Sequence, residues 1–255
     1  MAESEYIKIM ENEEYHDSEG LSASGIKLFL ECPRKYFYRY VLKIKPKPTP
    51  AMLEGSAFHE FVLEPEKFNS VNWKQEKLEQ FKAMKESLYS IPTVSKMLSD
   101  GFAEGSLFWK DEGSGVTLKT RPDYLSLKQK AVFDLKTSSD ASKEGFSRSI
   151  HNFGYHIQAA MAIDGLKTCF GEEFDVINLV VEKSEPYCVG AYYIDLPSIA
   201  LGRKLYQHGI KLYLKCLNNN FWPSYTYQDE SENKCEIETI GVPFWVEKNF
   251  LAGEI

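Results

Sequence analysis

Hydrophobic positions recur at helical spacing through the first hundred residues of the chain. The run Ser22-Ala-Ser24, followed by apolar residues at 26 and 28–30, predicts a capped helix that continues to about residue 40. Three prolines at 46, 48 and 50 predict a stiff, extended connection. Further helices are predicted over residues 55–63 and 73–89. The first part of the chain is therefore expected to be helical.

The pattern changes after Gly101 to short runs rich in β-branched and aromatic residues, separated by turn residues. Strands are predicted over residues 106–110, 116–119, 124–127, 131–135, 176–181 and 189–194. Helices are predicted over residues 146–153 and 155–169, with a long one after Pro197. The tail from Trp222 is irregular and is expected to pack as an extended arm. This order predicts an α/β fold with a central mixed β-sheet flanked by helices.

The length of 255 residues suits one large domain or a core with appendages. We expect an N-terminal helical region (1–100) integral to the domain, a core (101–221) and a C-terminal tail (222–255). The hydrophobic content of 43% is ample for a packed core. No apolar run approaches the roughly 18 residues that a membrane span requires. The acidic, polar start lacks the features of a signal peptide, so we expect a cytoplasmic protein without a membrane partner.

Cysteine usage points away from disulfides and structural zinc. The five cysteines are Cys32, Cys169, Cys188, Cys216 and Cys235. Their odd number and wide spacing predict free thiols. The absence of a CxxC pair argues against a zinc site.

The formal net charge of −7 does not suggest a nucleic-acid partner, but one segment is strongly basic. Between Pro33 and Leu53 there are six cations and no acid: Arg34, Lys35, Arg39, Lys43, Lys45 and Lys47. Three tyrosines and a phenylalanine interleave them. A solvated helix face and a surface that meets phosphates and stacks on bases are equally good interpretations.

The most informative stretch is Arg121-Pro-Asp123, followed after ten intervening residues by Asp134-Leu-Lys136. Residues two apart on a strand point to the same face, so Asp134 and Lys136 can share one site. A hairpin would bring Asp123 beside Asp134. Two carboxylates and a strand carbonyl form a hard oxygen site suited to Mg²⁺, with Lys136 placed to orient or help deprotonate a metal-bound water.

The simpler interpretation is structural. A D-x-K triplet alone is usually a strand-edge salt bridge, and Pro-Asp alone is usually a turn. Phe133 and Leu135 point to the opposite, buried face, which makes the combined motif more specific.

Three further polar residues are ambiguous from spacing alone. Glu104 precedes a predicted strand. It either supplies a third carboxylate to the site or is an ordinary acidic residue of a loop. His59, in a largely apolar helix, is more often a hydrogen-bonded core residue than a ligand. Gln158 is either a structural glutamine or a donor to a DNA oxygen or a water.

At this point the chain resembles the nuclease domain of the RecE family (exonuclease VIII), within the PD-(D/E)xK superfamily with its restriction-endonuclease-like core. The resemblance spans roughly residues 12 to 223. Its segments are Asn12-Glu-Glu-Tyr-His16 leading to Leu21-Ser-Ala-Ser24; Leu53-Glu-Gly-Ser-Ala-Phe-His59 with Leu63-Glu-Pro65; Ala103-Glu104 before Phe108-Trp109; Arg121-Pro-Asp123 with Asp134-Leu-Lys136-Thr137; and Tyr155-His-Ile-Gln158-Ala-Ala160.

The resemblance implies a role for each site residue. Asp123, Asp134 and the Leu135 carbonyl would hold a metal ion, and Lys136 would act at the nucleophilic water. His59 would be a further ligand or phosphate contact, and Glu104 would complete a second metal site. Gln158 and Tyr155 would contact DNA or order the water. Separately from the resemblance, the candidate DNA-binding residues are Arg34, Lys35, Arg39, Lys43, Lys45 and Arg121.

The family implies a function as well. Its members degrade linear double-stranded DNA 5′→3′ with Mg²⁺, for which Mn²⁺ is expected to substitute. They leave a 3′ single strand for a RecT-like annealing protein, and they work as homo-oligomeric rings in bacterial or phage-infected cells.

One segment departs from this family. The run Cys32-Pro-Arg-Lys-Tyr36 is similar to the entry helix of helicase–nucleases and Cas4 proteins, some of which hold an iron–sulfur cluster through four cysteines. Only Cys216 and Cys235 lie near the carboxyl end here, so no cluster is expected. The alternatives are a repair or CRISPR-associated nuclease of the same superfamily, and a catalytically silent protein that binds DNA ends.

Overall fold

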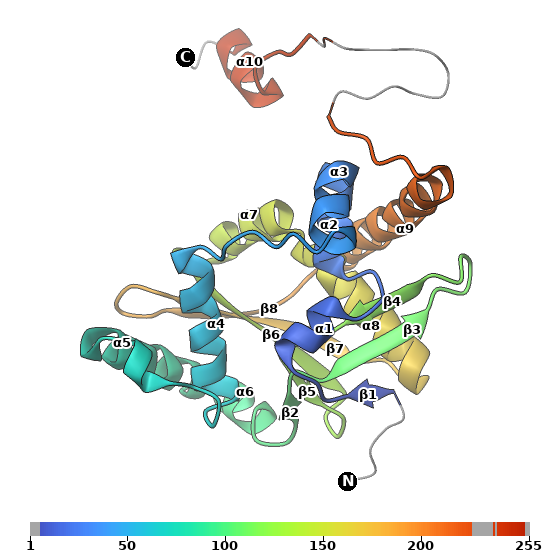
Figure 1. Cartoon of the computed structure of the whole chain (residues 1–255). Coiled ribbons are helices and arrows are strands. Elements are labelled where there is room, and N and C mark those ends of the chain that lie inside the picture. Colours follow the sequence, from blue (N-terminus) through green and yellow to red (C-terminus); the bar gives the residue numbers. More distant parts are fainter. Residues whose placement is uncertain (1–5, 226–236, 238, 253–255) are drawn as a thin grey trace.

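The computed structural model describes residues 6–225, 237 and 239–252, in which helices surround two β-sheets (Figure 1). The larger sheet has the strand order β2-β5-β6-β7-β8, and the smaller has the order β1-β3-β4. The strands are β1 (Ile7–Lys8), β2 (Phe102–Ala103), β3 (Ser106–Lys110), β4 (Thr117–Thr120), β5 (Tyr124–Ser126), β6 (Ala131–Ser138), β7 (Asp175–Glu182) and β8 (Val189–Tyr193).

The larger sheet is mixed, which confirms the predicted fold class. β5 and β6 form an antiparallel hairpin, β6 and β7 run parallel, and β8 returns antiparallel to β7. A parallel pair requires a crossover, which α7 (Lys143–Phe153) and α8 (Tyr155–Phe170) supply. β3 and β4 form a separate antiparallel sheet with β1, a division that the sequence pattern did not predict.

The predicted helix over residues 22–40 is wrong as a continuous element. α2 (Ala23–Glu31) begins as expected, because the Ser22 hydroxyl accepts a hydrogen bond from the Gly25 N–H. It ends at Cys32, which is extended because the following residue is Pro33. A short α3 (Pro33–Tyr36) and a π-helical turn, η1 (Phe37–Val41), follow this break.

α4 (Pro50–Leu63) begins five residues earlier than predicted. Thr49 caps it by accepting a hydrogen bond from the Met52 N–H, and Pro50 occupies the first turn, where its missing N–H costs nothing. The extended connection therefore ends before the third proline, which is the first residue of α4.

The remaining helices are α1 (Asn12–Asp17), the short η2 (Ser70–Asn72), α5 (Gln75–Tyr89), α6 (Pro92–Met97), α9 (Leu196–Asn219) and α10 (Phe244–Leu251). Gly154 separates α7 from α8 at a φ of 74°, a conformation that glycine adopts without strain. α10 shows that the prediction of a wholly irregular tail was wrong. The other residues of the tail beyond Tyr225 lie partly outside the described residues.

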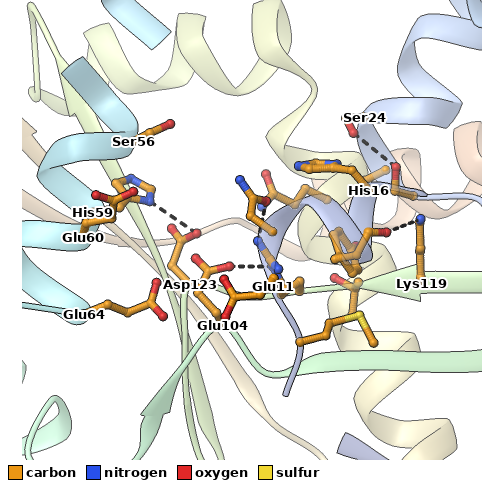
Figure 2. Close-up of a pocket in the computed structure, with 18 of the residues that line it drawn as sticks. Glu11, His16, Ser24, Ser56, His59, Glu60, Glu64, Glu104, Lys119 and Asp123 are labelled. Atoms are coloured by element: carbon orange, nitrogen blue, oxygen red, sulfur yellow. Dashed lines mark hydrogen bonds and ion pairs between the residues drawn. The ribbon is translucent and has the colours of Figure 1, made fainter. Parts of the chain in front are cut away.

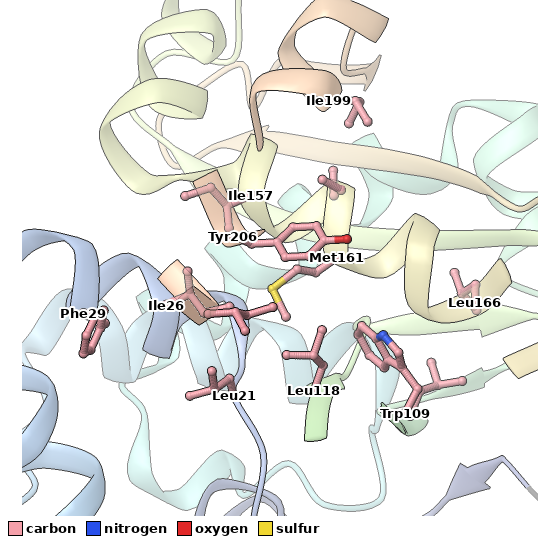
Figure 3. Packing of buried hydrophobic residues seen from close by; sticks show 14 of the residues in the cluster. Leu21, Ile26, Phe29, Trp109, Leu118, Ile157, Met161, Leu166, Ile199 and Tyr206 are labelled. Carbon is pink, nitrogen blue, oxygen red and sulfur yellow. The ribbon is translucent and has the colours of Figure 1, made fainter. Parts of the chain in front are cut away.

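Two hydrophobic cores cover the two faces of the larger sheet. Phe133 and Leu135 of β6 pack with Phe58 and Val62 of α4 and with α5 and α6. Val132, which points the other way, packs in a core with α8 and α9. Figure 3 shows this second core, where Met161 of α8 and Tyr206 of α9 meet Leu118 and Trp109 of the smaller sheet. The alternation along β6 thus directs its even-numbered residues toward α8.

No helix among the described residues is both long enough and apolar enough to span a membrane.

Candidate active site

Asp123 and Asp134 lie where the β5–β6 hairpin stops pairing. The last pair is Tyr124 with Phe133, so the two aspartates are the next opposed positions, as predicted from their spacing. Beyond this point β6 continues beside β7 to Ser138, while the chain of β5 leaves the sheet. The Leu135 N–H donates to Asp123 Oδ2 at 2.6 Å, so the side chain of Asp123 bonds the backbone of β6.

Asp134 is buried between two donors on the α8 side of β6. Its Oδ2 lies 2.7 Å from Lys136 Nζ, and its Oδ1 accepts from Gln158 Nε2 at 2.8 Å. The side chains of Asp134 and Lys136 are only 8% and 17% exposed, so their interaction is weakly screened by solvent. The triplet is therefore an inward-facing ion pair and not an exposed strand-edge salt bridge.

His59 approaches Asp123 from α4. Phe58 is fully buried in the core below the helix, and the neighbouring His59 side chain, 25% exposed, points to Asp123 with Nδ1 3.5 Å from Oδ1. Burial lowers the pKa of His59, but the charge of Asp123 outweighs it and raises the pKa above its ordinary value. His59 is thus a polar residue of the site, although a core position was the commoner interpretation of its sequence context.

The electrostatics of the centre follow from these contacts. Burial would raise the pKa of the Asp123 carboxyl, but His59, Lys136 and the Leu135 amide hold it well below its usual range. Burial would lower the pKa of the Lys136 ammonium, but the two aspartates raise it above its usual value. Burial and the nearby Asp123 raise the pKa of Asp134 against the opposing charge of Lys136. In this geometry the Lys136 ammonium is placed to orient a water.

Tyr155 lies over Lys136 at the start of α8. The Lys136 Nζ is 4.9 Å from the centroid of the Tyr155 ring, within cation–π distance. Burial raises the pKa of the Tyr155 hydroxyl, and Lys136 partly opposes this rise. Tyr155 and Gln158 therefore both contact the Asp134–Lys136 pair from the same helix.

Glu104 is near the centre but is bonded to Arg121. Its backbone N–H donates to the Asp123 carbonyl at 3.1 Å, and its Oε2 lies 2.5 Å from Arg121 Nε. Burial and the charge of Asp123 raise the pKa of Glu104 to about 7, with Arg121 opposing. The structure therefore places Glu104 beside Asp123, with its carboxylate paired to an arginine.

Asp134 and Tyr155 line a small separate pocket together with Gln158. Asp123, His59, Glu104, Arg121 and Gln158 line a cleft of about 420 Å³ between α4, α1 and the start of α2 (Figure 2). Sequence reasoning missed several of its residues, because nothing in their spacing links them to the motif. They are Ser56, Glu60 and Glu64 of α4, His16 of α1, Lys119 of β4 and Phe153 of α7. Asn178 of β7, in register with Asp134 and buried with Nδ2 unbonded, was missed as well.

The predicted DNA-binding residues do not gather at one place. Arg34, Lys35 and Arg39 line a second groove of about 410 Å³, with Tyr38 and Tyr225. Lys43 and Lys45 bond Asp17 at the end of α1. Arg121 alone belongs to the cleft.

The donor set suits a hard cation such as Mg²⁺, which is commonly bound by one or two carboxylates and several waters. Asp123, Asp134 and the Leu135 carbonyl are the residues that would hold it. Each carboxylate oxygen of the two aspartates now faces a nitrogen donor, from His59, Leu135, Gln158 or Lys136. Accordingly, no three His, Cys, Asp or Glu side chains of the described residues converge as a ready-made metal cage.

The cysteines relevant to an iron–sulfur cluster are placed apart from this cleft. Cys32 is buried, with Sγ 4.0 Å from the Pro223 carbonyl, and Cys216 is buried in α9. Cys235 lies outside the described residues.

Comparison with known proteins supports the fold. A Eubacterium rectale protein, whose crystal structure is described as a "Putative exonuclease", is similar with a TM-score of 0.70 at 15% identity, covering 97% of this chain and 100% of that chain. A phage related exonuclease from Haemophilus somnus 129PT matches less well, with a TM-score of 0.38 at 12% identity over 81% of this chain and 99% of that chain. No curated relative matches by sequence.

A family model described as "PDDEXK-like domain of unknown function (DUF3799)" matches residues 22–237. That range includes every residue of the Asp123, Asp134 and Lys136 centre together with His59, Glu104 and Gln158. The chain belongs to this PDDEXK-like family, with the α/β fold of the PD-(D/E)xK nucleases.

Proposed function

We propose that the protein is a Mg²⁺-dependent exodeoxyribonuclease that degrades linear double-stranded DNA 5′→3′, leaving 3′ single strands for recombination by strand annealing. The observation that supports it most directly is the buried Asp134–Lys136 ion pair next to Asp123, which itself lines a polar cleft. An ammonium next to two carboxylates has no use in a protein that only binds DNA ends. The polarity and the annealing step rest on the resemblance to the RecE family.

Each residue of the centre has a role in this proposal. Asp123 and Asp134 would hold the cation, which would supply charge stabilisation at the phosphate. Lys136 orients the attacking water and stabilises the charge that develops on the phosphate. Gln158 fixes the Asp134 carboxylate through Oδ1, and the Tyr155 ring confines the Lys136 ammonium. His59 positions Asp123 through Oδ1.

The test is incubation of the purified protein with linear duplex and Mg²⁺, alongside the variant Lys136→Ala. We expect nucleotides to be released from linear DNA and the variant to lose at least about a hundredfold in rate, since it lacks both orientation and charge stabilisation. Lys130→Ala is the matched control, because Lys130 is about half exposed and bonds Glu172. Intact duplex after incubation, with Lys136→Ala behaving like the wild type, would contradict the enzyme and favour a silent end-binding protein.

Covalently closed circular DNA separates exonuclease from endonuclease. We expect linear duplex to be degraded while the circle survives, because a threading enzyme needs an end. Rapid cutting of closed circles would show an endonuclease instead. Iron in the purified protein would favour the repair or CRISPR-associated nuclease.

We also propose that the protein works as a homo-oligomeric ring with a RecT-like annealing partner, as the resemblance implies. The measurement is the solution mass of the protein by light scattering, with and without DNA. A monomer under both conditions would contradict the ring.

A further inference from the structure

Asn178 is a buried polar residue in the middle of the larger sheet. It lies on β7 in parallel register with Asp134 of β6 and is only 2% exposed. The two side chains lie on the same face of the sheet, since both line the small pocket beside α8. The flanking residues on this face of β7 are Val176 and Val180, which pack in apolar clusters. Packing alone therefore does not explain an amide at position 178.

The Asn178 amide is not fully bonded. Its Nδ2 is buried and bonds no atom in the part of the chain that the structure describes. That nitrogen carries two N–H donors, and a buried donor without an acceptor is costly. Buried polar groups in folded proteins are usually paired with protein atoms or with ordered water. The unbonded donor therefore indicates an acceptor other than the side chains around it.

The pocket beside this amide has the size of a water site. Its volume is about 10 Å³, close to the least that accepts one water molecule. A buried water typically makes two to four hydrogen bonds. The polar side chains in the wall can supply them, and they are Thr120, Asp134, Tyr155, Gln158 and Asn178.

The chemistry of the wall selects water over an ion. An amide N–H opposes a cation, and the carboxylate of Asp134 opposes an anion. Water can accept a hydrogen bond from an amide and donate one to a carboxylate at the same time. A phosphate or a nucleotide is far larger than this pocket.

Asp134 has the capacity for a further hydrogen bond. Its Oδ1 accepts from Gln158 Nε2 at 2.8 Å, and its Oδ2 lies 2.7 Å from Lys136 Nζ. An ionised carboxylate has about four lone-pair sites, so each oxygen can accept once more. Sites therefore remain both for a cation and for a water.

We propose that this pocket holds one ordered water, which accepts from Asn178 Nδ2 and donates to the Asp134 carboxylate. Asn178 is then a positioning residue for the metal site of the proposed function, on which the inference rests. Lys136 and Gln158 hold the carboxylate from β6 and from α8, and the water holds it from β7. Partners that orient a metal-binding carboxylate in this way typically contribute about 10–100-fold to metal affinity.

The decisive variant is Asn178→Leu, which keeps the approximate volume of the side chain and removes its donor. The readout is the affinity of the protein for Mn²⁺ in the absence of DNA, measured from the electron paramagnetic resonance signal of the free ion, with Mg²⁺ as competitor. We expect the dissociation constant to rise at least about tenfold. Circular dichroism and denaturation in a chelator establish that the variant is folded.

Two further variants separate positioning from packing. Asn178→Ser retains a donor to the water, so it should bind Mn²⁺ more tightly than Asn178→Leu does. Ser106→Ala is the matched control, because Ser106 Oγ is also buried without a partner among the described residues, on β3 and outside this pocket. That variant should bind Mn²⁺ as the wild type does.

A crystal structure of the wild type tests the water directly and does not depend on how a variant folds. We expect density for one water within about 3 Å of both Asn178 Nδ2 and an oxygen of Asp134. A pocket without this density, or an Asn178 amide that bonds a protein atom instead, would overturn the inference.

Unchanged Mn²⁺ affinity in a folded Asn178→Leu variant also overturns it and leaves the proposed nuclease intact. An equal loss of affinity in Ser106→Ala overturns it as well, because the loss would then reflect a general effect on the fold. If the wild type binds neither Mn²⁺ nor Mg²⁺, the metal site of the proposed function fails instead.

Discussion

The carboxylate of Asp134 receives one donor on each oxygen, and the two donors have different consequences. Lys136 is a charge partner, and under the proposed function its removal is expected to affect the chemistry. Gln158 is a neutral donor that reaches Asp134 from α8 and fixes its orientation. A buried acceptor that loses its donor keeps the full cost of desolvation. The two positions therefore permit catalysis and stability to be tested separately.

For the variant Gln158→Leu we expect the free energy of unfolding to fall by about 1–3 kcal/mol, because Asp134 Oδ1 loses its donor in a buried position. Chemical denaturation in the presence of a chelator measures this. Gln75→Leu is the control, since Gln75 is exposed and bonds Glu79 within α5. Equal stability of Gln158→Leu and the wild type would show that the bond contributes nothing to the fold.

Lys119 predicts a pH dependence. Burial and the charge of Lys43 lower the pKa of Lys119 to about 8, below its value in the unfolded chain. The buried charge therefore costs stability fully below pH 8, and this cost is relieved as the pH rises from there toward about 10.5.

Accordingly, the stability of the wild type relative to Lys119→Met should rise between pH 8 and 9.5, by at most about 1.4 kcal/mol per pH unit. Because all other titrating groups are present in both proteins, their contributions cancel when the free energy of unfolding of the variant is subtracted from that of the wild type. Denaturation midpoints at several pH values check it, and a difference that stays constant with pH would contradict the lowered pKa.

Among the elements, α8 and α9 position the site most tightly. Gly202 of α9 lies against the backbone of α8, where an added Cβ would collide with the His156 carbonyl. His156 is two residues before Gln158, so this close approach fixes the part of α8 that faces Asp134. A change at Gly202 is thus transmitted to the centre through backbone, not through a flexible side chain.

We expect Gly202→Ala to lower the stability by about 1–3 kcal/mol, because overpacking outweighs the roughly 1 kcal/mol that alanine gains over glycine within a helix. Gly55→Ala in α4 is the contrast, since its Cβ would approach its nearest neighbour only to 4.0 Å. That variant should stabilise the protein. Thermal melts of both distinguish the effects, and the same sign in both would contradict the packing argument.

The elements also show what the sequence could predict. The hydrophobic pattern of the sequence predicts β6 and α8. The spacing of Asp123 and Asp134 predicts the hairpin that brings these two residues together. α1 is short and polar, and it is held by tertiary contacts such as Lys119 with the Tyr15 carbonyl, so no local pattern reveals it. Pro33 is a signal for the break at Cys32, but the apolar residues on both sides of it follow helical spacing. That spacing led to the wrong prediction of one continuous helix.

The site shows the same difference between residues that a local sequence pattern reveals and residues that only tertiary packing brings together. Asp134, Lys136 and Asp123 are close in sequence and were found together. His59 and Gln158 come from distant helices, and only the resemblance indicated their role. Glu60 and Asn178 belong to no motif, and His16 stands in a segment of the resemblance that gave it no role. Tertiary packing brings all three near the centre.

At the scale of the whole molecule, a bound cation should stabilise the native protein by mass action, because the unfolded chain does not hold Asp123 and Asp134 together. We expect Mg²⁺ and Ca²⁺ to raise the melting temperature of the wild type and to have no such effect on Asp123→Asn. At a concentration one hundred times the dissociation constant the gain is about 2.7 kcal/mol. An equal rise in both proteins would indicate non-specific ion effects.

His59, Leu135, Gln158 and Lys136 already offer a nitrogen donor to every carboxylate oxygen of the two aspartates. The two aspartates thus have hydrogen-bond and charge partners from the protein itself, so we expect the chain to fold without the cation. Chelation should therefore leave an intact, inactive enzyme, and addition of Mg²⁺ should restore activity without refolding. Such a protein can be loaded onto DNA ends first and started afterwards at a chosen moment, so that all molecules begin digestion together.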